Sequence, residues 1–341
     1  MIIPGCQFAS DNTAGVCPEA WAALEEANHG FESSYGDDHF TGEACDAFRD
    51  LFETNCDVYF VFTGTAANSL SLASLCRSYQ SVIAHQVAHV ETDECGAPEF
   101  FSNGSKLLLA TGADGKCDVT DVERLITHRK DLHFPKAKAL SLSQSTEFGT
   151  VYTPGELKSL WGVTRSHGLN IHMDGARFAN AVASLDCSPA KITWQSGVDV
   201  LCFGGTKLGM AMTEAVVFFN RELGAEFAWR CKQAGQLASK MRFISAQWSR
   251  LLRDGTWLKY ARQANGHAQA LASGLQQIPG VELLHPVQAN AVFAKLPVEV
   301  DQRLRAAGWK YYNFIGGGAR FMCSWKTSAE DVNALLTLAR G

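Results

Sequence analysis

The chain has 341 residues, a length that suits one large domain with a smaller one beside it. Hydrophobic residues make up 46% and charged residues 19%, so the chain can bury a sizeable core, and a net charge of −5 gives no sign of a nucleic-acid or membrane surface. No apolar run approaches a membrane span, and the first residues lack the basic and apolar regions of a secretory signal.

The eleven cysteines include no CxxC pair, since the closest two lie eleven positions apart. This spacing argues against a disulfide framework or a structural zinc site. We expect reduced thiols in a cytoplasmic protein, and no ligand cluster calls for a metal ion.

Short apolar runs predict seven strands, at residues 58–62, 82–85, 107–111, 139–143, 170–174, 200–204 and 215–220. Helix starts fall between them. Thr120 with Glu123, and Thr153 with Glu156, read as capping boxes, and the second helix begins at Pro154 and should end near Gly168. This alternation predicts an α/β fold, a mostly parallel central sheet with helices on both faces, whose ligands bind beyond the carboxyl ends of the strands.

Two segments that follow early strands are candidates for binding. Gly64 and Thr65 lie in a turn of small residues before a helix predicted at 69–76, where free amides and the helix dipole suit a phosphate. A plain helix cap would look the same. His89, or His85 four positions earlier, could supply a planar ring or a proton acceptor, although a lone histidine is more often structural.

Lys207 and Asp174 follow two of the predicted buried strands, and Arg177 lies close to Asp174. A lysine that forms a Schiff base and a carboxylate that holds a proton on a pyridine nitrogen are the parts that bind pyridoxal 5'-phosphate (PLP). Arg177 could contact the 3-oxygen of the ring or pair with Asp174. We interpret His172 as structural. The simpler alternatives are a solvated lysine at a strand end and an aspartate that caps a helix.

The pattern changes after residue 225. A long helical stretch is predicted at 226–275, followed by strands at 281–285 and 291–296, a helix at 298–307, two strands around Gly316–Gly318 and a capped helix from Thr327. We therefore expect a large PLP-binding domain at 1–250 and a small α+β domain at 251–341. Arg320 starts a strand there and could grip a substrate carboxylate, or lie on the surface of a hairpin.

Together these residues resemble the low-specificity L-threonine aldolases, which are fold type I PLP enzymes. The resemblance spans nearly the whole chain, and the pieces that carry it are Ser10-Asp11-Asn-Thr, Tyr35-Gly-Asp-Asp38, Gly64-Thr65-Ala-Ala-Asn68, His89 with Glu94, His172-Met-Asp-Gly-Ala-Arg177, Lys207 and Arg320. It implies retro-aldol cleavage of L-β-hydroxy-α-amino acids (L-threonine, L-allo-threonine and phenylserine) to glycine and an aldehyde.

The resemblance also implies roles for individual residues. Lys207 would bond to the cofactor, Asp174 would hold the pyridine nitrogen, His89 would stack on the ring, and Gly64 and Thr65 would hold the phosphate. Ser10 and Arg320 would bind the substrate carboxylate, with help from Arg177. The family forms tetramers with sites between subunits, so Tyr35, Lys240 or Arg242 would come from a neighbour.

The chain departs from the family pattern after the strand at 139–143. Members often carry Asn-Thr-His there, whereas this chain reads Ser143-Gln-Ser-Thr-Glu147. Gln144 would replace the asparagine as a ring contact, and the proton acceptor is left open between His89, His85 and a water held by them. The alternatives are another fold type I enzyme, an aminotransferase or a β-eliminating lyase, and a non-catalytic protein of the same fold.

Overall fold

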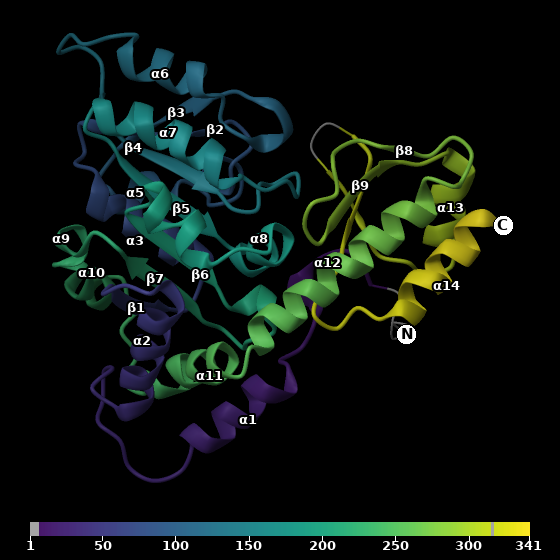
Figure 1. Cartoon of the computed structure of the whole chain (residues 1–341), viewed down its shortest axis with the longest axis horizontal. Helices are drawn as coiled ribbons and strands as arrows, with labels where there is room; N and C mark the ends of the chain where they lie inside the picture. The colour runs from purple at the N-terminus through teal and green to yellow at the C-terminus, as the bar shows by residue number, and fades with distance from the viewer. Residues whose placement is uncertain (1–6, 315–316) are drawn as a thin grey trace.

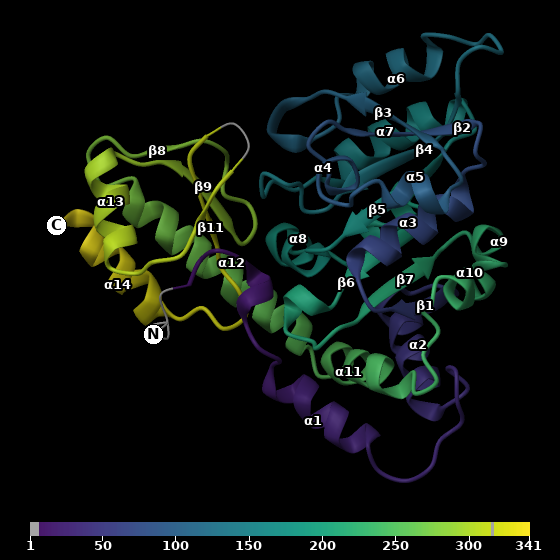
Figure 2. The same ribbon diagram turned by 180° about the vertical axis from the view of Figure 1, so that it is seen from behind.

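The computed structural model describes residues 7–314 and 317–341, which form two sheets with helices packed around them (Figures 1 and 2). The larger sheet has the strand order β1-β7-β6-β5-β4-β2-β3. Its strands are β1 Asp57–Val61, β2 Gln80–His85, β3 Lys106–Ala110, β4 Lys136–Ser143, β5 Asn170–Gly175, β6 Val200–Gly204 and β7 Glu214–Phe218. Each of the seven predicted strands overlaps one of these, so the strand predictions are confirmed.

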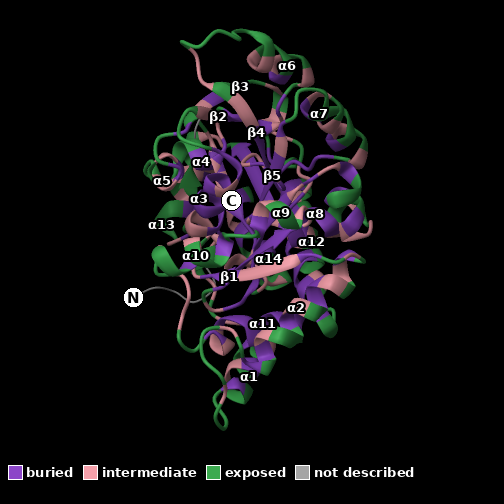
Figure 3. Ribbon diagram, turned by 90° about the vertical axis from the view of Figure 1, so that its left-hand side faces the viewer, coloured by how far each residue is buried: buried purple, intermediate pink, exposed green. Residues whose placement is uncertain are grey.

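The strands β3, β2, β4, β5 and β6 are parallel neighbours, and β7 runs antiparallel to both β6 and β1. Because side chains alternate along a strand, β6 buries Leu201 and Phe203 against one layer of helices and Val200 and Cys202 against the other. Figure 3 shows buried residues concentrated around β5 in the middle of the sheet, whereas the edge strand β3 is only partly buried. A mostly parallel sheet covered on both faces confirms the predicted fold class.

The helices of the described residues are α1 Pro18–Ala27, α2 His39–Phe52, α3 Gly64–Leu75, α4 His89–Thr92, α5 Ala97–Phe101, α6 Val119–Thr127, α7 Pro154–Ser166, α8 Phe178–Leu185, α9 Arg221–Gly224, α10 Phe227–Gln233, α11 Arg242–Arg253, α12 Thr256–Leu275, α13 Val298–Ala306 and α14 Ala329–Arg340. Helices α2, α7, α8 and α11 contribute to the core on one face of the sheet, and α3 and α10 to the core on the other. None of the described helices has the length and apolarity that crossing a membrane requires.

The predicted helical stretch at 226–275 is wrong as one element. It consists of α10, α11 and α12, and the chain turns at Gly235 and Gly255, whose φ angles are +71° and +75°. Only glycine adopts such angles without a steric penalty, so each glycine ends a helical segment.

Two predicted helix starts are also wrong. Helix α6 is capped by Asp118, which accepts from the Thr120 and Asp121 amides, rather than by Thr120. Helix α3 starts at Gly64 with Thr63 as its cap, five residues before the predicted start. The Thr153 capping box on α7 is confirmed.

The smaller sheet has the order β10-β11-β9-β8, from Glu282–Leu283 (β8), Ala291–Lys295 (β9), Tyr312–Asn313 (β10) and Ala319–Met322 (β11). Helices α12, α13 and α14 cover it (Figure 1). The N-terminal segment, which we expected in the large domain, lies against this sheet, because Phe8 packs in its core and its amide donates to the Lys310 carbonyl. The domain boundary at 250/251 stays a prediction, and Gly316 lies outside the described residues.

Candidate active site

Five of the predicted site residues line one cavity of about 550 Å³, between the carboxyl ends of the large-sheet strands and the smaller sheet. They are Ser10, His89, Arg177, Lys207 and Arg320. Segments from both ends of the chain therefore meet at this cavity, as the sequence predicts.

Lys207 lies in a short 3-10 turn, Thr206–Leu208, directly after β6. Two glycines make this turn possible. A Cβ atom on Gly205 would lie 2.5 Å from the Thr213 carbonyl oxygen, and Gly209 has a φ of +107°. The tight packing of this turn fixes the backbone from which the Lys207 side chain reaches the cavity.

Asp174 ends β5 as a buried carboxylate with two donors. Its Oδ1 accepts from the Ala176 amide at 2.9 Å, and its Oδ2 accepts from Asn68 Nδ2, in helix α3, at 3.0 Å. These two hydrogen bonds hold the side chain in one orientation. Asp174 can therefore serve as a fixed hydrogen-bond acceptor.

The same Asn68 nitrogen also donates to Glu94 Oε1 at 2.8 Å, and His89 Nδ1 lies 2.8 Å from that oxygen. Burial raises the pKa of Glu94, and the hydrogen bond to Glu94 raises the pKa of His89. The sequence does not predict that Asn68 bridges Glu94 and Asp174, because these two partners lie 26 and 106 positions away.

Arg177 pairs with Asp11 and not with Asp174, which corrects one of the alternatives considered from the sequence. Its Nε and one terminal nitrogen donate to the two carboxylate oxygens of Asp11 at 2.7 and 3.0 Å. Burial raises the pKa of Asp11, but Arg177 more than offsets this effect, so the pKa lies below its usual value. Asn290 donates to the same carboxylate at 3.1 Å.

Arg320 extends from β11 and is flanked by aromatic rings, with its guanidinium carbon 5.0 Å from the Phe314 ring and 5.6 Å from the Tyr312 ring. One terminal nitrogen donates to the Ala9 carbonyl at 3.4 Å, and its buried Nε has no hydrogen-bond partner among the described residues. Burial and the nearby Arg177 lower the pKa of Arg320. A partly buried guanidinium that has no carboxylate partner among the described residues suits an anionic ligand.

Gly64 and Thr65 form the first turn of α3, where Thr63 Oγ1 accepts from the Ala66 amide. The first amides of a helix precede its internal hydrogen bonds and point outward at the positive end of its dipole. A Cβ atom on Gly64 would contact nothing within 4 Å, so there is open space beside this turn. The turn can hold a phosphate, although neither residue lines the cavity.

Two predicted site residues do not line the cavity and form hydrogen bonds with backbone atoms instead. The His85 ring contacts the Gly112 carbonyl at 3.2 Å and accepts from the Val87 amide. The Gln144 side chain exchanges two hydrogen bonds of 2.9 Å with the backbone of Tyr152 and does not line the cavity, so its role as a ring contact stays a prediction. His172 is buried, which lowers its pKa to about 4, and fits the structural interpretation.

Tyr35, Lys240 and Arg242 do not line the cavity within one chain. Tyr35 is half exposed, its ring lies under the Lys232 ammonium at 4.5 Å, and its amide donates to the Ser239 carbonyl. Their expected role requires a second subunit.

Three carboxylates near the site were missed from the sequence. Asp93 and Glu147 line the cavity, and Glu147 lies on the loop between β4 and α7. Glu214 begins β7, and its Oε2 accepts from the Gly205 amide at 2.9 Å. Burial raises the pKa of Glu214 to about 7. The Ser-Thr-Glu run after β4 was a signal for Glu147, whereas Glu214 looked like the start of an ordinary strand.

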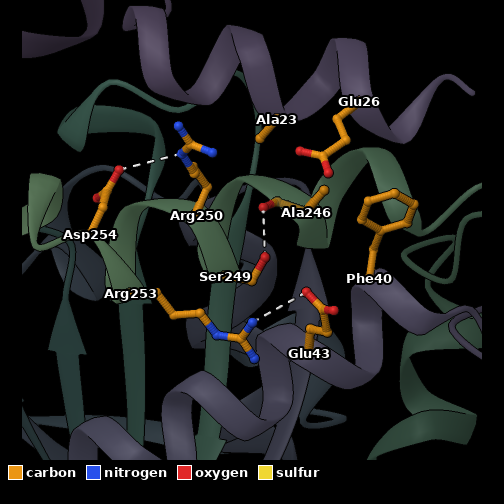
Figure 4. A pocket seen from close by; sticks show the side chains of 9 residues that line it. All are labelled: Ala23, Glu26, Phe40, Glu43, Ala246, Ser249, Arg250, Arg253 and Asp254. Atoms are coloured by element: carbon orange, nitrogen blue, oxygen red, sulfur yellow. Dashed lines mark hydrogen bonds and ion pairs between the residues drawn. The ribbon is translucent and has the colours of Figure 1, made fainter.

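A separate cavity of about 350 Å³ lies between α1, α2 and α11 (Figure 4) and contains no predicted site residue. Its arginines are already paired, Arg253 with Glu43 at 3.4 Å and Arg250 with Asp254 at 3.5 Å. We therefore locate the functional site at the Lys207 cavity.

Comparisons with known proteins show the family of the chain. The family model of the beta-eliminating lyases matches residues 7–298. The chain is 59% identical, over 96% of its length and 95% of theirs, to the "Low specificity L-threonine aldolase" of a Pseudomonas species and to that of Pseudomonas aeruginosa. The solved structure of a Leishmania major threonine aldolase matches with a TM-score of 0.92 and 28% identity, covering 98% of each chain.

Proposed function

The chain belongs to the beta-eliminating lyase family and, within it, to the low-specificity L-threonine aldolases, and from this premise we propose that it cleaves L-threonine and related L-β-hydroxy-α-amino acids, including L-allo-threonine and phenylserine, to glycine and an aldehyde. The observation that carries the proposal is the meeting of Lys207 and Arg320 in one cavity. The buried Asp174 is linked to His89 on that cavity through Asn68 and Glu94. A lysine nucleophile and an arginine for a carboxylate are what an amino-acid cleaving site needs.

The cofactor of this proposal is PLP, and the residues present fit it. Asp174, which accepts from Asn68 and from the Ala176 amide, is a fixed acceptor that suits a protonated ring nitrogen. The first turn of α3 suits the phosphate. When bound, PLP supplies an aldehyde that bonds to the Lys207 amine and a ring that accepts the electron pair of the breaking bond.

The chain's own residues would orient the substrate. Arg320, with Ser10 and Arg177 on the same wall, would hold the substrate carboxylate and so set the direction of its Cα–Cβ bond. The hydrogen bond to Glu94 fixes the plane of the His89 ring, as a ring that stacks on the cofactor requires.

We also propose that the active protein is a homotetramer in which Tyr35, Lys240 or Arg242 reaches the site of a neighbouring subunit. The Tyr35 and Met212 side chains are 50% and 59% exposed, so each is free to contact a neighbouring subunit. The cytoplasmic location stays a prediction from the cysteine content.

The test is to incubate the purified protein and PLP with L-threonine, L-allo-threonine and threo-phenylserine, and to assay both the aldehyde and glycine. The proposal predicts the two products in equal amounts. A 2-oxo acid with ammonia would identify a β-eliminating lyase instead, and a requirement for a 2-oxo acid would identify an aminotransferase.

A further inference from the structure

Glu147 is a carboxylate on the cavity wall that the site described above does not use. It lies at the tip of a tightly held loop. On one side Thr146 donates its amide to the Thr150 carbonyl at 2.8 Å and shares a side-chain hydrogen bond with Thr150. On the other side the Phe148 ring stacks on His285 with 4.1 Å between the ring centres. The backbone of Glu147 is therefore fixed in front of the cavity.

Glu147 lines the same cavity as His89, Arg177 and Arg320. Its charge is one of the causes that raise the pKa of His89 and of Arg177. Yet among residues 7–314 and 317–341 no hydrogen bond or ion pair to the Glu147 side chain is formed. Glu147 is a half-buried carboxylate that lines the cavity and has no hydrogen-bond or ion-pair partner among the described residues. It is therefore available to a ligand.

The other groups on the wall are less suited to accept a proton. His89 Nδ1 is bonded to Glu94, and this bond raises the pKa of His89. A raised pKa favours the imidazolium form of His89, which has no acceptor nitrogen. Asp93 is exposed and already accepts from Thr92 Oγ1 at 2.7 Å. Lys207 is committed to the cofactor in the proposed function.

We propose that Glu147 is the catalytic residue that accepts the proton of the substrate β-hydroxyl group, an inference that rests on the proposed aldolase function. The O–H bond breaks as a bond to the Glu147 carboxylate forms, and the O–H electron pair becomes the second bond of the aldehyde carbonyl. The electron pair of the breaking Cα–Cβ bond passes to the bound cofactor. Cα later gains one proton and Glu147 returns one to solvent, so the products need no further reactant.

The test compares two reactions of the Glu147→Gln variant. Cleavage of L-threonine needs a proton acceptor for the hydroxyl and should fall about 10²- to 10³-fold, the range of general base catalysis. Exchange of the glycine α-proton in D₂O, followed by proton NMR, breaks no C–C bond and involves no hydroxyl, so its rate should stay within about threefold of wild type. Quenching of tryptophan fluorescence by PLP should give an unchanged Kd.

Glu91→Gln is the matched control, since it removes an exposed carboxylate of helix α4 that does not line the cavity, and its cleavage rate should stay within about threefold of wild type. Wild-type cleavage by Glu147→Gln would overturn the proposal, as would an equal loss of cleavage and glycine exchange, which would place the effect on the cofactor or the fold. A wild-type protein that exchanges glycine protons but releases no aldehyde would instead refute the proposed function itself.

Discussion

The guanidinium of Arg177 binds both carboxylate oxygens of Asp11, at 2.7 and 3.0 Å, although the two residues are 166 positions apart. Both side chains are largely buried, with exposures of 12% and 1%. The pair joins the N-terminal segment to the end of β5 at the cavity. It also balances one of the positive charges that would otherwise crowd Lys207 and Arg320.

Replacing one partner of this pair should destabilise the protein. Asp11→Asn leaves the Arg177 charge buried with weaker compensation, so the free energy of unfolding should fall by about 3 to 5 kcal/mol in urea titrations at pH 7. Asp57→Asn is the control, because the Arg221–Asp57 pair is more exposed and should contribute less than about 1 kcal/mol. Equal losses from the two variants would contradict the account.

The loss of stability in Asp11→Asn should depend on pH. The pKa of Asp11 is lower in the folded state, so its stabilisation is present above the unfolded value of about 3.9 and is lost as the pH falls through the folded value. The difference in unfolding free energy between wild type and Asp11→Asn should therefore shrink below about pH 4. A difference that stays constant down to about pH 2 would argue against the charged pair.

Glu94→Gln should lower the pKa of His89, because Glu94 supplies the main interaction that raises it. The titration of the His89 ring can be followed by NMR, and its midpoint should move to lower pH in the variant. Glu91→Gln changes an exposed glutamate of the same short helix and should leave the midpoint where it is. An unmoved midpoint in Glu94→Gln would mean that the hydrogen bond does not control the charge of His89.

Glu214→Gln should stabilise the protein at alkaline pH. Burial in the folded state raises the pKa of Glu214 to about 7. The folded protein therefore binds this proton more tightly than the unfolded chain does, and it loses stability as the pH rises from about 4.5 through 7. A neutral glutamine avoids this loss. The gain at pH 8 should reach up to about 3 kcal/mol and vanish near pH 4, as measured by urea titrations at both values. A gain that is equal at both pH values would exclude this explanation.

How far the sequence predicts the molecule depends on how local each signal is. The strands of the large sheet were predicted because buried parallel strands are nearly continuous apolar runs, as in Val200–Gly204. Lys207 and Asp174 could be predicted as a pair because both follow such strands. The break at Gly255 was missed, since a glycine inside a helical pattern is often tolerated.

The partners inside the site could not be read from the sequence. Asp11 for Arg177 and Asn68 for Asp174 are contacts between distant segments, which only the packed topology determines. The hydrogen bonds of Gln144 to the backbone of Tyr152 could not be predicted for the same reason, because a backbone partner leaves no mark in a side-chain pattern.

Arg320→Lys should weaken substrate binding more than cofactor binding. Lysine keeps the charge but loses the planar fork that binds both oxygens of a carboxylate. We expect kcat/KM for L-threonine to fall on the order of 10²-fold, while the PLP Kd changes little. Lys295→Arg, at the exposed end of the neighbouring strand β9, is the matched control and should have no effect. A parallel loss of PLP affinity would place Arg320 at the cofactor instead.

The proposed site and function both require Lys207 to be the residue that bonds to PLP. The most direct measurement is to reduce the PLP-loaded protein with borohydride, digest it and locate the pyridoxyl group by mass spectrometry. We predict the group on the peptide that contains Lys207 and on no other lysine, and its loss in Lys207→Ala. Modification of a different lysine, or none after PLP is added, would contradict the assignment of the site.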